Sequence, residues 1–344
     1  MIELSNLTQI PPPLVDAAFQ TRMGNRIRCD ICPQLCKLDE GEVGICGGRQ
    51  VVNGQFWAMN YGQVCSLHLD AIEKKPLYHF YPGSEILSVG PNGCNLSCQW
   101  CQNWQISQNP APTRTILPQD LANMVDALDG IGAAYTFAEP LIWFEFVRDA
   151  GRILHERGLV NVFITNGYVN PEPLRELLPL ADAFNVDLKA SDDRCYRDFC
   201  GGHLEDVQRT IRMVYDAGKH VEITHLLVTN VTASMERLEH LVDWIAAIDP
   251  NIPLHLSRYF PSHRFNEPPT AIEFMLQAYE AARAKLTWVY LGNLWIGKGQ
   301  SSYCPQCGEL LVERGGLSVE IGALKGDVCG KCGAKLNFLS AKWD

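Results

Sequence analysis

The chain has 344 residues and a formal net charge of −10, and it is 47% hydrophobic and 20% charged. This composition is typical of a globular protein, and the negative charge disfavours nucleic acid as the main partner. No apolar run is long enough to span a bilayer, and the N-terminus lacks the basic and apolar segments of a signal peptide. We therefore expect a cytoplasmic protein with no membrane partner.

The first segment, residues 1–85, is rich in turn residues and is expected to be an irregular cap. It carries four cysteines with the spacing C-x2-C-x3-C-x9-C, namely Cys29, Cys32, Cys36 and Cys46. Four such thiolates can hold zinc or an iron–sulfur cluster, and reduced structural thiols are the alternative. We expect a metal here that supports the cap over one end of the next domain rather than taking part in its chemistry.

Residues 86–292 alternate short apolar strands with amphipathic helices. Strands are expected at residues 86–90, 133–137, 161–167, 183–189, 220–228, 253–259 and 288–292. Helices are expected at residues 118–129, 141–157, 171–180, 204–217, 235–248 and 270–286. Repeated strand–helix units predict an α/β fold with a parallel sheet and right-handed crossovers. A full or partial TIM-type barrel is the expected form, and a doubly wound open sheet is the alternative.

Polar side chains stand within several of the expected strands or directly after them. They are Glu139, Thr165, Asn166, Asp187, Lys189 and His255. Chemistry in a parallel α/β barrel lies at the C-terminal ends of the strands. Ordinary loop polarity is the alternative explanation, but Asp187 and Lys189 share one side of an apolar strand, where a charge without a use is costly.

Cys94, Cys98 and Cys101 follow the first expected barrel strand with the spacing C-x3-C-x2-C. Three thiolates can bind three irons of a [4Fe–4S] cluster and leave the fourth iron open. An open coordination position distinguishes a reactive metal site from a structural one. A fourth ligand from elsewhere in the chain is the alternative.

The last segment, residues 293–344, contains two C-x2-C pairs, formed by Cys304, Cys307, Cys329 and Cys332. Two such turns present four sulfurs tetrahedrally and predict a closed structural zinc site, with rubredoxin-type iron as the alternative. The remaining cysteines are expected to be small buried hydrophobic residues, and they are Cys65, Cys195 and Cys200.

The stretch "CNLSCQWC", with Trp100 before the third cysteine, resembles the cluster loop of the radical S-adenosylmethionine (SAM) superfamily. The motifs "DAIEKKPLYHFYPG", "TFAEPLIWFEF", "TNGY", "VDLKA" and "VYLGN" are similar to the radical SAM member of the AmmeMemoRadiSam system, which is itself similar to pyruvate formate-lyase activating enzymes. This resemblance covers essentially the whole chain.

The resemblance implies roles for individual residues. Glu139, with the backbone at Ala138, would bind the SAM amino group, and Lys189, beside Asp187, would bind the SAM carboxylate. His255 is a further SAM contact by the same resemblance. The expected cofactor-binding set is completed by Trp100, Thr165 and Asn166.

The resemblance also implies a [4Fe–4S] cluster that cleaves SAM reductively to a 5′-deoxyadenosyl radical, which abstracts hydrogen from a substrate. It implies an external one-electron reductant of the flavodoxin or ferredoxin kind and, as in activating enzymes, a protein or peptide substrate. A radical SAM synthase that modifies a small metabolite or peptide is one alternative. An iron–sulfur electron carrier or scaffold is another, although a carrier would normally close its cluster with four cysteines.

Overall fold

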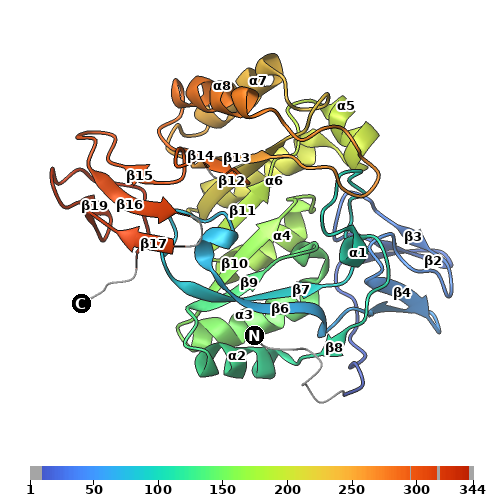
Figure 1. Cartoon of the computed structure of the whole chain (residues 1–344). Helices are drawn as coiled ribbons and strands as arrows, with labels where there is room; N and C mark the ends of the chain where they lie inside the picture. The colour runs from blue at the N-terminus through green and yellow to red at the C-terminus, as the bar shows by residue number, and fades with distance from the viewer. Residues whose placement is uncertain (1–9, 295, 316–317, 341–344) are drawn as a thin grey trace.

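The computed structural model describes residues 10–294, 296–315 and 318–340, so parts of the first and last expected segments lie outside the described residues. Its centre is a nine-stranded sheet in the order β14-β13-β12-β11-β10-β9-β7-β6-β8 (Figure 1). The strands are β6 (Gln63–Ala71), β7 (Glu85–Pro91), β8 (Arg114–Thr115), β9 (Gly132–Tyr135), β10 (Val160–Thr165), β11 (Ala183–Asp187), β12 (His220–Leu227), β13 (Leu254–Arg258) and β14 (Val289–Gly292).

Every neighbouring pair from β7 to β14 is parallel, which confirms the expected α/β fold. β6 pairs with β7 in antiparallel orientation, and β8 pairs with β6 in the same way. Within the described residues no pairing joins the edge strands β8 and β14, so the sheet is open and a full barrel is not formed. All seven expected strands are present.

Helices connect the parallel strands, as expected. They are α1 (Trp104–Ser107), α2 (Pro118–Ala127), α3 (Phe144–Glu156), α4 (Pro171–Leu177), α5 (Asp193–Cys195), α6 (Leu204–Asp216), α7 (Met235–Ala246) and α8 (Ile272–Arg283). Each longer helix buries one face, because apolar residues recur with the helical period. Among the described helices, none is long and apolar enough to cross a membrane.

The N-terminal cap forms two small sheets beside the main one. Their strands are β1 (Gln20–Met23), β2 (Arg26–Cys29), β3 (Lys37–Leu38), β4 (Arg49–Val52) and β5 (Gln55–Ala58). The cap is attached through Glu145 at the start of α3. Its carboxylate accepts a hydrogen bond from the backbone N–H of Ala18 at 2.8 Å and pairs with the Arg49 guanidinium at 2.8 Å.

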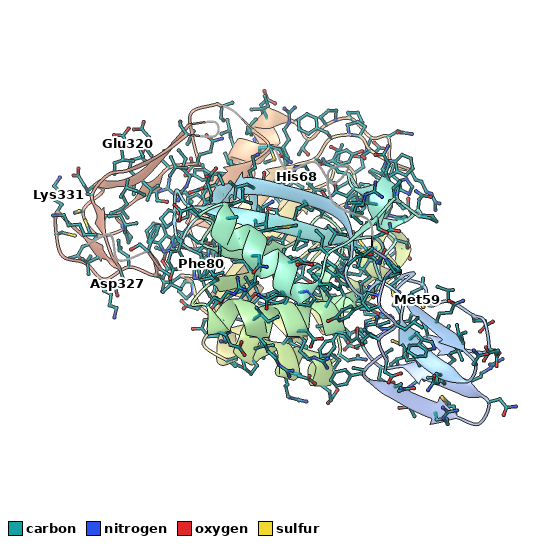
Figure 2. The ribbon with its side chains drawn as sticks, turned by 90° about the horizontal axis from the view of Figure 1, so that it is seen from below. Met59, His68, Phe80, Glu320, Asp327 and Lys331 are labelled. Atoms are coloured by element: carbon teal, nitrogen blue, oxygen red, sulfur yellow. The ribbon has the colours of Figure 1, made fainter. Side chains whose placement is uncertain are left out.

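The C-terminal ribbon is built from five short strands. They are β15 (Ser302–Tyr303), β16 (Leu310–Gly315), β17 (Ser318–Ile321), β18 (Leu324–Lys325) and β19 (Val328–Cys329). Figures 1 and 2 show the ribbon and the cap on opposite sides of the central sheet. The division at residues 85 and 292 stays a prediction, and β6 of the first segment pairs along its length with β7 of the second.

Candidate active site

Cys94, Cys98 and Cys101 lie in the loop between β7 and α1, and all three line a cavity of about 370 Å³. The loop begins at Gly93, which has a φ of 103°. A Cβ atom there would lie 2.0 Å from the Cys46 carbonyl oxygen, so only glycine allows the cap and the loop to approach this closely. The three thiols therefore face one hollow at the C-terminal ends of the parallel strands, where the sequence predicts the chemistry.

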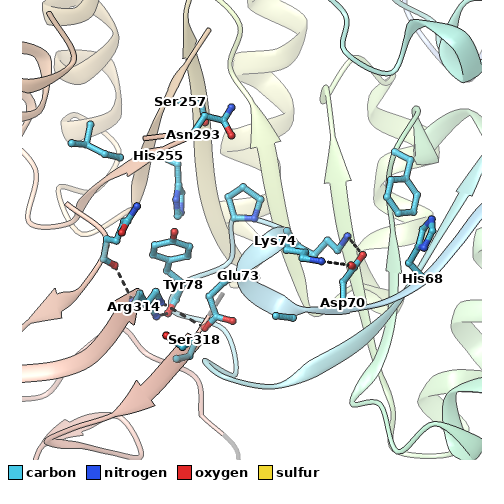
Figure 3. A pocket seen from close by; sticks show the side chains of 18 residues that line it. His68, Asp70, Glu73, Lys74, Tyr78, His255, Ser257, Asn293, Arg314 and Ser318 are labelled. Carbon is cyan, nitrogen blue, oxygen red and sulfur yellow. Dashed lines mark hydrogen bonds and ion pairs between the residues drawn. The ribbon is translucent and has the colours of Figure 1, made fainter. Parts of the chain in front are cut away.

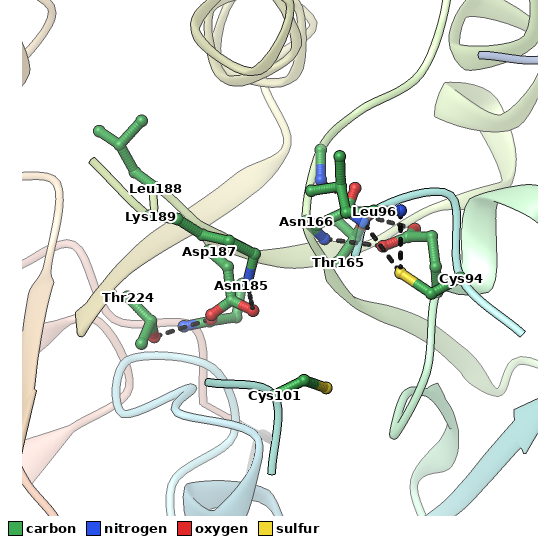
Figure 4. A network of polar contacts seen from close by, with 12 residues as sticks. Cys94, Leu96, Cys101, Thr165, Asn166, Asn185, Asp187, Leu188, Lys189 and Thr224 are labelled. Carbon is green, nitrogen blue, oxygen red and sulfur yellow. Dashed lines mark hydrogen bonds and ion pairs between the residues drawn. The ribbon is translucent and has the colours of Figure 1, made fainter. Parts of the chain in front are cut away.

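Two thiols of this loop lie beside hydrogen-bonding groups, and Figure 4 shows those at Cys94. The Cys94 sulfur accepts from the backbone N–H of Leu96 at 3.4 Å and from Asn166 Nδ2 at 3.5 Å. The Cys101 sulfur lies 3.2 Å from the Ser107 hydroxyl. Donors of this kind favour the thiolate form, which is the form that binds metals.

Glu139 follows β9 and presents a buried carboxylate to the same cavity. Its oxygens accept from the Thr165 hydroxyl at 2.6 Å and from the backbone N–H groups of Asn166 at 2.8 Å and Leu141 at 3.0 Å. Burial raises the pKa of Glu139 to about 7, although these three donors oppose the rise. A cation placed in the cavity would therefore favour the ionised carboxylate.

Asp187 and Lys189 come from the end of β11 and also line this cavity. Lys189 Nζ lies 3.0 Å from an Asp187 carboxylate oxygen. Burial would lower the pKa of Lys189, but Asp187 and the nearby thiols of Cys98 and Cys200 outweigh it and raise that pKa well above its usual value. The lysine is thus a permanent cation at the site.

The remaining predicted residues fall into two groups. Trp100, Ala138 and Asn166 line the cavity of the three cysteines. Thr165 lies behind it and orients Glu139. The cavity therefore combines three thiols with the carboxylates of Glu139 and Asp187 and the ammonium group of Lys189, which come from separate strands and loops.

His255 lines a second cavity of about 580 Å³, which Figure 3 shows from close by. Its Nε2 lies 2.6 Å from the Glu222 carboxylate, and its ring packs edge-on against Tyr78 with ring centroids 4.7 Å apart. The two cavities adjoin, because five residues line both, namely Lys74, Lys75, Phe137, Ser257 and Asn293. The structure thus separates His255 from the residues around the three cysteines.

Three residues at the site were not expected from the sequence. Lys75 is buried in the wall between the cavities and pairs with Asp70 at 2.8 Å, and the motif "EKKP" was its only signal. Phe137 adopts a φ of 70°, which is rare for a bulky residue and forms the sharp turn before Glu139. Cys200, expected to be only a buried hydrophobic residue, is buried but its backbone carbonyl also accepts from the N–H of Ser97 in the cysteine loop at 2.8 Å.

The four cysteines of the cap also lie together. Cys29, Cys32, Cys36 and Cys46 line one small pocket with Arg49. The pocket borders the loop of the three cysteines, since Gln34 donates from the cap to the Asn95 carbonyl at 2.9 Å.

The four cysteines of the ribbon form a compact metal-binding group. Their sulfurs all lie within 4.8 Å of one another, with 3.6 Å between Cys304 and Cys332 and 3.7 Å between Cys307 and Cys329. Four sulfurs at about 2.3 Å from one tetrahedral ion stand roughly 3.8 Å apart. The group therefore fits a single metal ion, as predicted, and this geometry is common to zinc and rubredoxin-type iron.

We expect the ribbon to bind one zinc ion per chain. A Cys304→Ser/Cys307→Ser variant should lose that ion, because two thiolates cannot close the tetrahedron. Elemental analysis of the purified full chain measures this, with Cys65→Ser as the matched control outside every cysteine group. A zinc content that is equal in the double variant and the control would contradict the assignment, and iron in place of zinc would identify a rubredoxin-type centre.

Comparison with known proteins agrees with this arrangement. The profile described as Radical SAM superfamily matches residues 89–245, the part that holds the cysteine loop, Glu139 and Lys189. An uncharacterized protein of Methanocaldococcus jannaschii is 39% identical over 333 residues, which are 94% of this chain and 99% of that protein.

Two further proteins are more distant. The pyruvate formate-lyase-activating enzyme of Clostridium pasteurianum is 28% identical over 161 residues, which are 45% of this chain and 67% of that enzyme. The crystal structure of Streptococcus suis SuiB bound to S-adenosylmethionine has a TM-score of 0.50 and 14% identity, and covers 62% of this chain and 49% of SuiB. It shares the fold. The profile match and the three-cysteine loop over the strand ends together show that this chain is a member of the radical SAM superfamily.

Proposed function

We propose that the chain binds SAM in the cavity of Cys94, Cys98 and Cys101 and uses it to abstract hydrogen from a substrate, in the manner of a glycyl-radical activating enzyme. The observation that carries this proposal is the set of groups that face one cavity, which include three thiols, the buried Glu139 carboxylate and the half-buried Lys189 ammonium. Bound SAM exposes an ammonium, a carboxylate and a sulfonium, so the cavity offers a partner of opposite charge to each end of its methionine part.

The superfamily implies a [4Fe–4S] cluster, and three thiolates with an open fourth position fit it. When bound, that cluster supplies the electron for reductive cleavage of SAM to methionine and a 5′-deoxyadenosyl radical. Before that cleavage, Glu139 would accept hydrogen bonds from the SAM ammonium, and Lys189 would donate to the SAM carboxylate. Asp187 positions Lys189 through their 3.0 Å ion pair.

The activating-enzyme reading draws support from the relative named pyruvate formate-lyase-activating enzyme, which matches less than half of this chain. On this proposal, the substrate of the present chain would be a protein partner that receives a glycyl radical. The electron would come from a flavodoxin or ferredoxin in the cytoplasm. A synthase acting on a small metabolite or peptide is the second candidate. The adjoining cavity of about 580 Å³ favours it, because a small substrate could be held there beside SAM.

One experiment tests these two candidates. The chain is reconstituted anaerobically with iron, sulfide, SAM and a reductant, and is then mixed with candidate glycyl-radical partners or with small metabolites. An activating enzyme gives a glycyl doublet on the partner in electron paramagnetic resonance, together with 5′-deoxyadenosine. Formation of 5′-deoxyadenosine that depends on a small molecule, without the doublet, identifies the synthase. No 5′-deoxyadenosine under any condition would refute both.

We expect Lys189→Ala and Glu139→Gln to weaken SAM binding while the cluster still assembles. Hydrogen bonds to charged groups contribute about 1.5–3 kcal/mol, so each change should raise the Kd for SAM by roughly 10-fold to 150-fold. Calorimetry on the reconstituted chain measures this, with the exposed Lys285→Ala as control. Unchanged SAM affinity in both variants would exclude these residues as ligands of the methionine end.

A further inference from the structure

The four cap cysteines enclose a small pocket of mostly apolar lining. Cys29, Cys32 and Cys46 are buried and Cys36 is half-buried, and all four line the pocket. The other lining side chains are mostly aliphatic and include Ile31, Ile45 and Ile142. A dry, apolar surround of this kind protects iron–sulfur clusters from water.

The spacing of the sulfurs separates the two kinds of site. In the part of the chain that the structure describes, only the ribbon brings three or more metal-binding groups within 4.8 Å of one another. Neither the cap cysteines nor Cys94, Cys98 and Cys101 do so. A single zinc ion needs sulfurs roughly 3.8 Å apart, whereas the thiolates of a [4Fe–4S] cluster stand further apart because irons and sulfides lie between them. The cap cysteines are therefore not gathered as tightly as the ribbon cysteines that fit a single ion.

Arg49 gives an independent sign of a bound group. Its side chain is 1% exposed and lines the cap pocket, yet its Nε has no hydrogen-bond partner. The other guanidinium nitrogens are used by the Gly48 carbonyl, Asn60 and Glu145. A buried donor without a partner is rare in a native protein. An iron–sulfur cluster ligated by four thiolates is anionic and accepts hydrogen bonds at its sulfurs. It would therefore attract the Arg49 guanidinium and accept a hydrogen bond from its free Nε.

The cap pocket also borders the radical SAM loop closely. Gln34 of the cap donates to the Asn95 carbonyl at 2.9 Å, and the Asn95 side-chain oxygen accepts from Asn166 Nδ2 at 2.9 Å. The same Asn166 nitrogen lies 3.5 Å from the Cys94 sulfur. Hydrogen bonds thus run from the cap through Gln34, Asn95 and Asn166 to the Cys94 thiol.

We propose that Cys29, Cys32, Cys36 and Cys46 hold a second [4Fe–4S] cluster that relays electrons to the cluster at Cys94, Cys98 and Cys101. An external low-potential donor of the flavodoxin or ferredoxin class reduces the cap cluster by one electron. The cap cluster passes that electron to the site cluster and returns to its oxidised state, and no bond or proton is exchanged. The relay rests on the proposed SAM cleavage, but the existence of the cluster does not.

The existence of the cap cluster is tested with a Cys94→Ala/Cys98→Ala/Cys101→Ala variant of the full chain. After anaerobic reconstitution it should retain about four irons and four labile sulfides per chain, half of the wild-type content, and give the resonance of a reduced cluster with dithionite. Labile sulfide excludes a rubredoxin-type iron in the ribbon as the source. Loss of all sulfide in this variant would overturn the proposal, whether or not the wild type cleaves SAM.

The relay is tested with Cys29→Ser/Cys32→Ser, with Cys65→Ser as control. The double variant should lose about half of its labile sulfide and form 5′-deoxyadenosine about tenfold more slowly with reduced flavodoxin. With dithionite, a small reductant that can reach the site cluster directly, the rate should match the control. Equal rates with flavodoxin would overturn the relay. If the double variant does not fold, Cys36→Ser, which removes the half-buried ligand, is assayed in the same way.

Discussion

Replacing Cys94, Cys98 or Cys101 by alanine is expected to abolish SAM cleavage. Under the proposed function each thiolate is one of three ligands for the site cluster and the fourth position binds SAM, so no ligand is spare. The measurement is 5′-deoxyadenosine formed by each reconstituted variant with dithionite, for which we expect no product above background.

The matched control is Cys195→Ser, which changes a buried cysteine outside the three groups of metal-binding cysteines. It should retain SAM cleavage. Product formation by any of the three alanine variants at the control rate would contradict the ligand assignment. Cys200 offers an informative comparison, because its backbone carbonyl bonds to Ser97 of the cysteine loop but its thiol is not expected to bind iron.

Glu145→Ala is expected to destabilise the protein strongly. The Glu145–Arg49 ion pair is almost fully buried, with 2% exposure of each side chain. Removing one partner of a buried pair leaves an uncompensated charge and costs about 3–5 kcal/mol of the free energy of unfolding. The change also takes the acceptor away from the backbone N–H of Ala18, so the cap should separate from α3 first.

The midpoint of urea unfolding measures this effect, with Glu280→Ala as control. Glu280 forms an exposed ion pair with Lys298, and such pairs contribute about 1 kcal/mol or less. Glu145→Gln should fall between the two, since it keeps the shape and an acceptor but removes the charge. Equal midpoints for Glu145→Ala and the control would show that the buried pair does not hold the cap.

The repeating part of the fold was predictable because its signals are local. Short apolar runs and helical periods each lie within about ten residues, and the seven parallel strands and their helices appear where these patterns indicate. The partner of strand β6 was harder to predict. The alternating sequence of β6 predicts a strand, but nothing local tells which sheet it joins, and it pairs with β7 rather than with the cap.

Parts of the site depend on contacts between distant segments, and these could not be predicted. Glu145 looks like an interruption of an apolar run, and its partner Arg49 is 96 residues away. His255 was expected as a SAM contact by resemblance, which stays a prediction, and the adjoining cavity that it lines includes Tyr78 and the ribbon residue Arg314. The positions of Lys189 and Glu139 at strand ends could be predicted, because each lies in a motif at or directly after an expected strand.

The wall shared by the two cavities has a thermodynamic consequence. Lys74, Lys75 and Phe137 line both cavities, so a ligand that moves these side chains in one cavity reshapes the other. Binding in the two cavities is then linked, and linkage is reciprocal. The factor by which SAM tightens or loosens the occupant of the second cavity must equal the factor by which that occupant changes the affinity for SAM. A titration of either ligand with and without the other therefore measures the same coupling free energy.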